Sequence, residues 1–178
     1  MESLNKIKNS LAFASGNNIP PIDKWNPLLS GNIDIVIKTN GDWYHDGIKF
    51  TRQPLIKLFS SILKKEGNDY YLVTPIEKWR ITVECAPLIV AQMEATDTND
   101  ANQKIQFKTS TDDIFYLNDD HPLQISYDSF GEIKPLVRVR SNLDALIHRN
   151  IFYQLADMAK NVNGAWGVWS DGVFFKLE

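Results

Sequence analysis

Cations and aromatic rings lie close together at two places in the chain, and these are the residues with the clearest capacity for chemistry. Thr74 to Lys78 (TPIEK) follows an aromatic run and supplies a hydroxyl, a carboxylate and an ammonium group. Arg149 and Tyr153 lie one helical turn apart in the second half. Arg and Lys beside aromatic faces suit an anionic ligand with a flat ring, such as a nucleotide. The alternative to such a ligand site is that these residues form separate ion pairs on the surface.

Two amides extend the second group. Asn150 and Gln154 are one turn apart on the same predicted helix and fall within its apolar stripe. Buried amides must find hydrogen-bond partners. They therefore form either a structural network between two parts of the fold or a polar floor for a ligand.

Two further residues complete the candidate site. Arg52 precedes the first predicted helix, and His45 lies in a predicted strand. If helix packs against sheet, these groups converge with the others at one junction. The predicted ligand-binding residues are His45, Arg52, Thr74, Glu77, Lys78, Arg149, Asn150, Tyr153 and Gln154.

An enzyme acting on a small phosphorylated or nucleotide substrate is the alternative to a binding module. His45, Glu77 and Tyr153 would then be the acid–base candidates. The sequence contains no Walker loop and no dinucleotide fingerprint. Catalytic residues and cofactors are therefore not predicted, and a domain that binds other proteins is the third possibility.

A metal site is not predicted either. His45, His121 and His148 have no His, Cys or carboxylate partner at metal-ligand spacing. The single cysteine, Cys85, cannot form an internal disulfide and lies in a strand-like run, which indicates a core thiol.

Composition limits the partners. The net charge of −3 and the pI of about 5.6 argue against binding to a nucleic acid polymer. No apolar stretch approaches the roughly 20 residues of a membrane span. We therefore expect a cytoplasmic protein that does not bind membranes, whose oligomeric state stays open.

The elements that must position these residues occur twice. The hydrophobic pattern of the sequence predicts an α+β fold of two tandem strand–strand–helix–strand–strand units. Extra antiparallel strands are predicted over residues 84–118, between the two units. Turns at Gly41 and Gly131 correspond. The predicted divisions are an N-terminal helix over residues 1–18, a first unit over 19–95 and a second over 96–178.

Each predicted unit contains one amphipathic helix. The first covers Pro54 to Lys65 and ends at Gly67-Asn68. The second is capped by Ser141 with Asp144 as the capping-box partner. Its predicted buried face consists of Leu143, Leu146, Ile147, Ile151, Leu155 and Met158.

Several sequence stretches resemble a bacterial family known as domain of unknown function 1285. The resemblance runs from about residue 19 to the end of the chain. It rests on Pro20-Pro21 with Trp25 and Pro27, Gly31-x-Ile33-Asp34, Gly41-x-Trp43-x-His45-x-Gly47, Leu58-Phe59-Ser60, Tyr71-Leu72-Val73-Thr74-Pro75-x-Glu77-Lys78, Ala86-Pro87, Arg149 with Phe152-Tyr153-x-Leu155, and Gly167-Val168-Trp169-Ser170-x-Gly172-x-Phe174-Phe175.

The resemblance implies a duplicated α+β fold whose C-terminal unit looks superficially like a pleckstrin-homology domain. It also implies a ligand site at the junction of the units, for a nucleotide-like molecule, and a signalling role. It carries no enzymatic activity with it. The chain departs from the family at Cys85, where an acidic residue is common.

Overall fold

A computed structural model describes residue 7 and residues 20–96 and 102–178 of the 178-residue chain. The predicted N-terminal helix falls almost entirely outside the described residues. The chain divides into two compact units, Met1–Glu84 and Cys85–Glu178. The expected boundary after residue 95 differs from this division, because the strand over residues 88–96 pairs only within the second unit.

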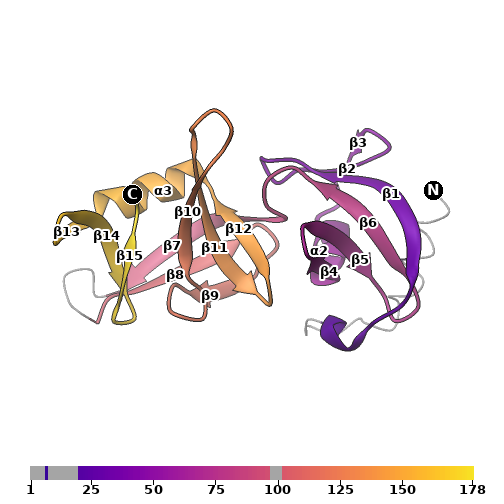
Figure 1. The fold of residues 1–178 in the computed structure, drawn as a ribbon, viewed down its shortest axis with the longest axis horizontal. Coiled ribbons are helices and arrows are strands. Elements are labelled where there is room, and N and C mark those ends of the chain that lie inside the picture. Colours follow the sequence, from indigo (N-terminus) through magenta and orange to yellow (C-terminus); the bar gives the residue numbers. More distant parts are fainter. Residues whose placement is uncertain (1–6, 8–19, 97–101) are drawn as a thin grey trace. The chain divides into compact units, whose positions relative to one another are not determined.

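Over residues 20–84 the first unit is a six-stranded sheet with an α-helix over residues 53–61 (Figure 1). The sheet order is β3-β2-β1-β6-β5-β4, and β1 and β6 run parallel while every other pair is antiparallel. The elements are the 3-10 helix Ile22–Lys24, β1 Leu29–Ile37, β2 Trp43–His45, β3 Ile48–Lys49, α2 Gln53–Ser61, β4 Leu63–Glu66, β5 Asp69–Val73 and β6 Lys78–Val83.

Burial along these strands alternates as strand geometry requires. Ile33, Ile35 and Ile37 of β1 are buried, whereas Asn32 and Asp34 are exposed. The predicted strand over residues 33–38 therefore exists, although it begins four residues earlier. Its buried face belongs to a core that also contains Trp43, Phe59, Ile62, Leu63 and Leu72.

The described residues of the second unit form two sheets and one α-helix. The larger sheet has the order β10-β11-β12-β7-β8-β9, and the smaller has the order β13-β14-β15. The elements are β7 Leu88–Thr96, β8 Lys104–Thr109, β9 Ile114–Tyr116, β10 Leu123–Tyr127, β11 Ile133–Arg140, β12 Leu143–Ile147, α3 Arg149–Asp157, β13 Lys160–Val162, β14 Ala165–Ser170 and β15 Val173–Lys176.

Ser170 joins the two sheets of the second unit. Its side chain is completely buried, and its hydroxyl donates to the Leu117 carbonyl at 2.6 Å and accepts from the Ile105 backbone N–H at 3.0 Å. The Gln103 side chain donates to the Trp169 carbonyl at 2.7 Å. Side-chain bonds therefore connect the smaller sheet to β8 and to the segment after β9.

The two units repeat one order of elements, consistent with the predicted duplication. Three strands precede a nine-residue helix and three strands follow it: β1-β2-β3-α2-β4-β5-β6 matches β10-β11-β12-α3-β13-β14-β15. The repeated unit thus has six strands rather than the four predicted. The extra strands β7, β8 and β9 fall where the sequence predicted them, between the copies.

The predicted start of the second helix is wrong. Ser141 lies in the turn between β11 and β12 with a φ of 44°, and Leu143–Ile147 is a strand. Alternate residues Leu143, Ala145 and Ile147 are buried, which is the period of a strand. The helix begins at Arg149, and the N-cap is His148, whose ring nitrogen accepts from the Asn150 backbone N–H.

The first helix is also shorter than predicted. It ends at Ser61, and Leu63–Glu66 forms β4, which pairs with β5. Gly67, with a φ of 61°, is in the hairpin turn between these strands rather than at a helix end. Neither helix in the described parts of the chain is long and apolar enough to cross a membrane.

Candidate functional site

The segment Thr74 to Glu77 is a closed turn between β5 and β6. The Thr74 side chain is fully buried, and its hydroxyl accepts from the Glu77 backbone N–H at 3.0 Å. The Thr74 backbone N–H donates to the Glu77 carbonyl at 2.8 Å. Pro75 occupies the turn position that its fixed φ favours. Thr74 therefore has a structural role in this turn.

Glu77 and Lys78 also have partners within the first unit. The Glu77 carboxylate accepts from the Trp79 indole N–H at 3.4 Å. The Lys78 ammonium lies 2.9 Å from a Glu66 carboxylate oxygen and 5.1 Å from the centre of the Tyr71 ring. Lys78 is thus held over an aromatic face, as the sequence predicted, but a carboxylate already compensates its charge.

Tyr71 is the centre of a row of side chains across three strands. It pairs with Lys64 of β4 on one side and Arg80 of β6 on the other. The Arg80 guanidinium lies 5.8 Å from the centre of the Tyr71 ring and 3.1 Å from the Asp69 carboxylate. We call Lys64, Tyr71 and Arg80 the first-copy row.

The pKa directions agree with this compensation. The hydrogen bond from Lys78 is the largest cause that lowers the pKa of Glu66; burial opposes it, and Lys64 lowers the pKa further. The hydrogen bond with the Tyr71 hydroxyl raises the pKa of Arg80, and Asp69 adds to the effect. The Glu66 carboxylate and the Arg80 guanidinium are therefore stabilised in their charged forms by groups of the same sheet.

His45 and Arg52 lie elsewhere in the first unit. The His45 ring stacks on Phe50 at 6.4 Å between ring centres and contacts Asp46 at 3.3 Å. Arg52 is the exposed N-cap residue of α2, and its side chain does not cap the helix. His45 pairs with Ile35 of β1, whereas Lys78 pairs with Leu29.

This register separates two of the acid–base candidates. Six residues of an extended strand between Leu29 and Ile35 span about 20 Å. His45 and Glu77 therefore do not form a catalytic pair within the first unit. A mechanism that needs these two side chains on one substrate atom has no support from their positions.

The four predicted residues of the second unit share the exposed face of α3. Arg149, Asn150, Tyr153 and Gln154 are all exposed, while Ile151 and Leu155 form the buried face. The expectation that the two amides are buried is therefore wrong. The reason is that α3 begins at Arg149, so its apolar stripe is narrower than a helix from Ser141 would have.

Arg149 and Tyr153 form a defined pair on this face. The Arg149 Nε atom donates to the Tyr153 hydroxyl at 2.6 Å, and the guanidinium lies 5.4 Å from the centre of the ring. Among the described residues, Arg149 forms no ion pair with a carboxylate. Its charge therefore remains available at the N-terminal end of α3, which itself favours anions.

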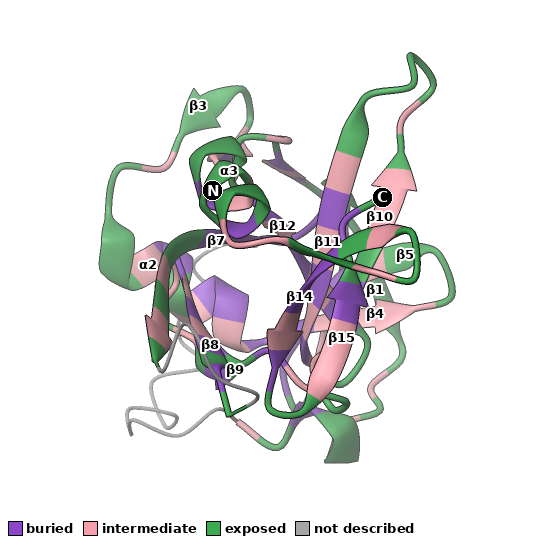
Figure 2. Ribbon diagram, turned by 90° about the vertical axis from the view of Figure 1, so that its left-hand side faces the viewer, coloured by how far each residue is buried: buried purple, intermediate pink, exposed green. Residues whose placement is uncertain are grey.

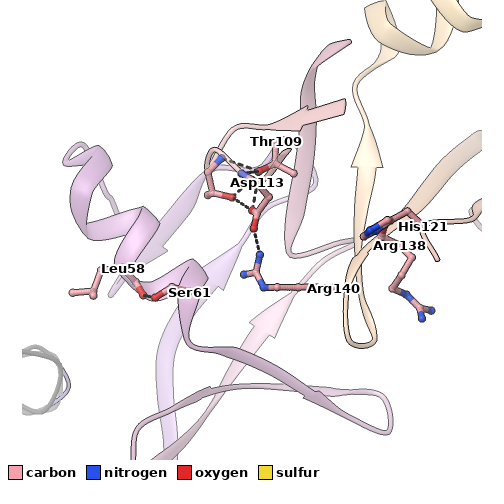
Figure 3. A network of polar contacts seen from close by, with 8 residues as sticks. Leu58, Ser61, Thr109, Asp113, His121, Arg138 and Arg140 are labelled. Carbon is pink, nitrogen blue, oxygen red and sulfur yellow. Dashed lines mark hydrogen bonds and ion pairs between the residues drawn. The ribbon is translucent and has the colours of Figure 1, made fainter. Parts of the chain in front are cut away.

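A partly buried polar network that the sequence did not predict lies in the β8–β9 turn (Figure 3). The Asp113 carboxylate accepts from the hydroxyls of Thr109 and Thr111, each at 2.9 Å, and forms a short ion pair with Arg140 of β11. Burial lowers the pKa of Arg140, and Asp113 opposes that shift. The network attaches the turn to β11 and has the character of a structural element.

The described residues contain no group of three or more His, Cys, Asp or Glu side chains that could hold a metal ion. Cys85 is partly buried, and burial raises the pKa of its thiol. A raised pKa disfavours the reactive thiolate.

Comparison with known proteins identifies the family. Residues 20–86 match "Domain of unknown function (DUF1285), N-terminal domain", and residues 87–177 match "Protein of unknown function (DUF1285), C-terminal domain". No curated protein matches the chain.

Two solved structures are similar to it. A crystal structure of a DUF1285 family protein from Silicibacter pomeroyi is 37% identical, with a TM-score of 0.87 over 94% of this chain and 93% of that chain. A second, from Shewanella baltica, is 24% identical, with a TM-score of 0.55 over 71% of this chain and 92% of that chain, and shows the fold alone. The chain belongs to the DUF1285 family.

Proposed function

We propose that this protein is a non-enzymatic ligand-binding module in signalling or regulation, and that the exposed face of α3 binds a nucleotide-like anion. One observation carries the proposal. Arg149 holds an uncompensated positive charge over the Tyr153 ring, with the side chains of Asn150 and Gln154 on the same face. A guanidinium binds phosphate through two parallel hydrogen bonds, and the amides offer donors and acceptors to a ring edge.

The five candidates of the first unit remain proposed ligand-binding residues of that unit alone. His45, Arg52, Thr74, Glu77 and Lys78 each sit in the first unit, and the Lys78 ammonium is paired with Glu66. An anion that binds Lys78 must compete with that carboxylate. We therefore assign the affinity of the α3 face to Arg149 and Tyr153.

A titration with ATP and with pyrophosphate tests the proposal. The expected result for the unmodified chain is a rise in melting temperature and saturable calorimetric binding of ATP. Arg149→Met is expected to weaken ATP binding about tenfold, because it removes a charged contact. Tyr153→Leu should weaken ATP more than pyrophosphate, since only ATP has a ring.

Tyr127→Leu is the matched control, because Tyr127 is also exposed but lies on the β10–β11 hairpin. It should leave ATP binding unchanged. The proposal fails if neither ATP nor pyrophosphate binds, or if Arg149→Met binds ATP as the unmodified chain does.

A protein-binding function is the second candidate, and the β10–β11 hairpin favours it. Phe130 at the turn is 92% exposed, and Tyr127 and Ile133 pair across the strands with exposed side chains. Asp128 holds the turn, because its carboxylate accepts from two backbone N–H groups of the hairpin. A rigid apolar tip is typical of contact sites. Analytical sedimentation of the unmodified chain and of Phe130→Asp would detect self-association through this tip. If both proteins sediment as monomers, self-association through the tip is excluded.

The predicted cytoplasmic location and the likeness of the second unit to a pleckstrin-homology domain remain part of this proposal. The lone cysteine supports the former. The two sheets and single helix of the second unit support the latter. Fractionation of the producing cell tests the location.

A further inference from the structure

The three strands that follow the helix are equivalent in the two copies, residue by residue. Pairing in the second copy aligns Lys160 of β13, Gly167 of β14 and Lys176 of β15 in one row. We call these residues the second-copy row. Each member lies 96 residues after a member of the first-copy row: Lys64 and Lys160, Tyr71 and Gly167, Arg80 and Lys176.

The charges around the two rows differ. In the first copy, Glu66 and Asp69 pair with each other across the strands, and both form ion pairs with cations of the same face. The equivalent positions in the second copy are Val162 and Ala165, which also pair with each other. The second copy therefore retains two cations and lacks both compensating carboxylates.

Both lysines of the second-copy row are exposed. Among the residues that the structure describes, neither forms an ion pair. Glu178 lies two residues beyond Lys176, and its carboxylate accepts from the Trp166 backbone N–H at 2.9 Å. The two lysine backbones are two strand spacings apart, about 10 Å, so both side chains can reach one anion between them.

An aromatic pair lies next to this row on the same face of the sheet. Trp169 and Phe174 pair across β14 and β15, with 5.3 Å between ring centres, and both are partly exposed. The residues between and beside them, Val168 and Phe175, point to the opposite, buried face. Both β14 and β15 contain buried residues as well as partly or fully exposed ones (Figure 2).

Gly167 gives this face its shape. A Cβ atom there would clash with the Phe175 carbonyl and would lie 2.7 Å from the Cζ atom of the Phe174 ring. The Phe174 ring therefore extends across the glycine, between the strands that carry the two lysines. Where the first copy places a buried tyrosine, the second presents a ring edge flanked by cations.

We infer that the outer face of β13–β15 is a second binding site, which takes a small planar aromatic ring carrying a phosphate group. The rings of Trp169 and Phe174 supply the stacking surface, and Lys160 and Lys176 supply the charge. The site is separate from the α3 face of the proposed function, and it involves none of the same residues.

Charge complementarity selects this ligand. Two lysines that form no ion pair with a described residue attract an anion, while an uncharged aromatic compound would leave their charge uncompensated. A long nucleic acid needs many more phosphate contacts than two, and the chain carries a net charge of −3. A mononucleotide combines one ring with one phosphate and therefore matches the face.

AMP, adenosine and inorganic phosphate are suitable probes, with amide chemical shifts as the readout. AMP is expected to shift the amides of residues 160–176 in a saturable way and more strongly than adenosine or phosphate alone. Lys160→Met with Lys176→Met should weaken AMP binding at this face about tenfold or more, and raised salt should weaken it as well. Lys24→Met, at an exposed lysine of the first unit, is the control and should have no effect.

The sharpest variant restores the carboxylates of the first copy without touching a lysine or a ring. Val162→Glu with Ala165→Asp should reduce AMP binding at residues 160–176 to the level of the double lysine variant. The inference is overturned if AMP fails to shift these amides, or if either double variant binds AMP there with unchanged affinity while remaining folded. Arg149→Met should leave these shifts intact, so this site and the α3 site can fail independently.

Discussion

The strands β4–β6 and β13–β15 have the same order, the same register and cations at matching positions, yet their outer faces differ. In the first copy, Glu66 and Asp69 compensate the cations around Tyr71. In the second, valine and alanine replace the carboxylates, and a glycine replaces the tyrosine. The same backbone thus supports a face whose charges are satisfied internally and a face whose charges are open to a ligand. In a duplicated fold, the copy whose cations have lost their carboxylate partners is therefore the better candidate for a binding site.

Burial decides whether a cation tolerates the loss of its partner, and the Arg140–Asp113 pair is the extreme case. Asp113→Ala should destabilise the second unit by about 3 kcal/mol or more, because it leaves a buried guanidinium without its carboxylate. Chemical denaturation combined with hydrogen exchange of β8 and β11 amides would measure this. Lys160→Met, on the open face, is the comparison and should change stability by less than about 0.5 kcal/mol. Equal effects of the two variants would contradict the distinction.

Tyr71 and Gly167 are the central residues of the two rows, and we expect that neither position tolerates a side chain of another size. Gly167→Ala should cost the second unit about 2–3 kcal/mol, since the added methyl group meets the Phe175 carbonyl and the Phe174 ring. Gly164→Ala serves as the control because open space surrounds that position, so only the strain of its φ of 90° applies. A smaller loss at Gly167 than at Gly164 would show that the close approach is not important.

Tyr71→Leu tests the first-copy centre. The variant keeps an apolar side chain but removes the ring beneath Lys78 and Arg80 and the hydroxyl that Arg80 contacts. We expect the first unit to lose about 1–2 kcal/mol. Denaturation followed through amides of β4–β6 would report it. No change in those amides would mean that the row contributes nothing to stability.

Low pH should lower the stability of β4–β6 in the first copy more than that of β13–β15 in the second, because only the first copy contains Glu66. Its pKa is lowered below the ordinary value of 4.5 in the folded chain, so its stabilisation is complete above that pH. It is lost as the pH falls through the folded-state pKa. Because the carboxylate is about a third exposed, we expect only about 0.5 kcal/mol. Glu66→Gln should flatten the acid side of the stability curve for β4–β6, and an unchanged slope would exclude this origin.

Much of the architecture follows from sequence pattern, and the errors lie where short segments satisfy two periods. Residues 143–147 fit both a helix and a strand, and pairing with β7 and β11 selects the strand. Lys64, Lys65 and Glu66 are good helix formers, but pairing with β5 overrides that preference. Assignment of β12 to a helix is what made the exposed amides of α3 look buried.

The second-copy row was not predicted, because cross-strand neighbours cannot be identified before both strands and their register are known. The sequence did contain a signal. A shift of 96 residues aligns Lys64 with Lys160 and Arg80 with Lys176, whereas the turns at Gly41 and Gly131 are 90 residues apart. The difference between these shifts reflects the longer strands β11 and β12 of the second copy together with a shorter connection between β12 and α3.

The sheet β13–β15 is attached through Ser170 and Gln103, and this attachment affects how binding of a ligand could be detected by hydrogen exchange. No backbone ladder joins it to the larger sheet among the described strands. Its opening breaks the bonds of Ser170 and Gln103 and exposes Val168 and Phe175, but it leaves the ladders of the larger sheet intact. We therefore expect its amides to exchange with solvent before those of β7, β8 and β11. A ligand on the outer face of this sheet would then suppress its local opening. Binding would slow the hydrogen exchange of the β13–β15 amides and leave the exchange of the other amides unchanged.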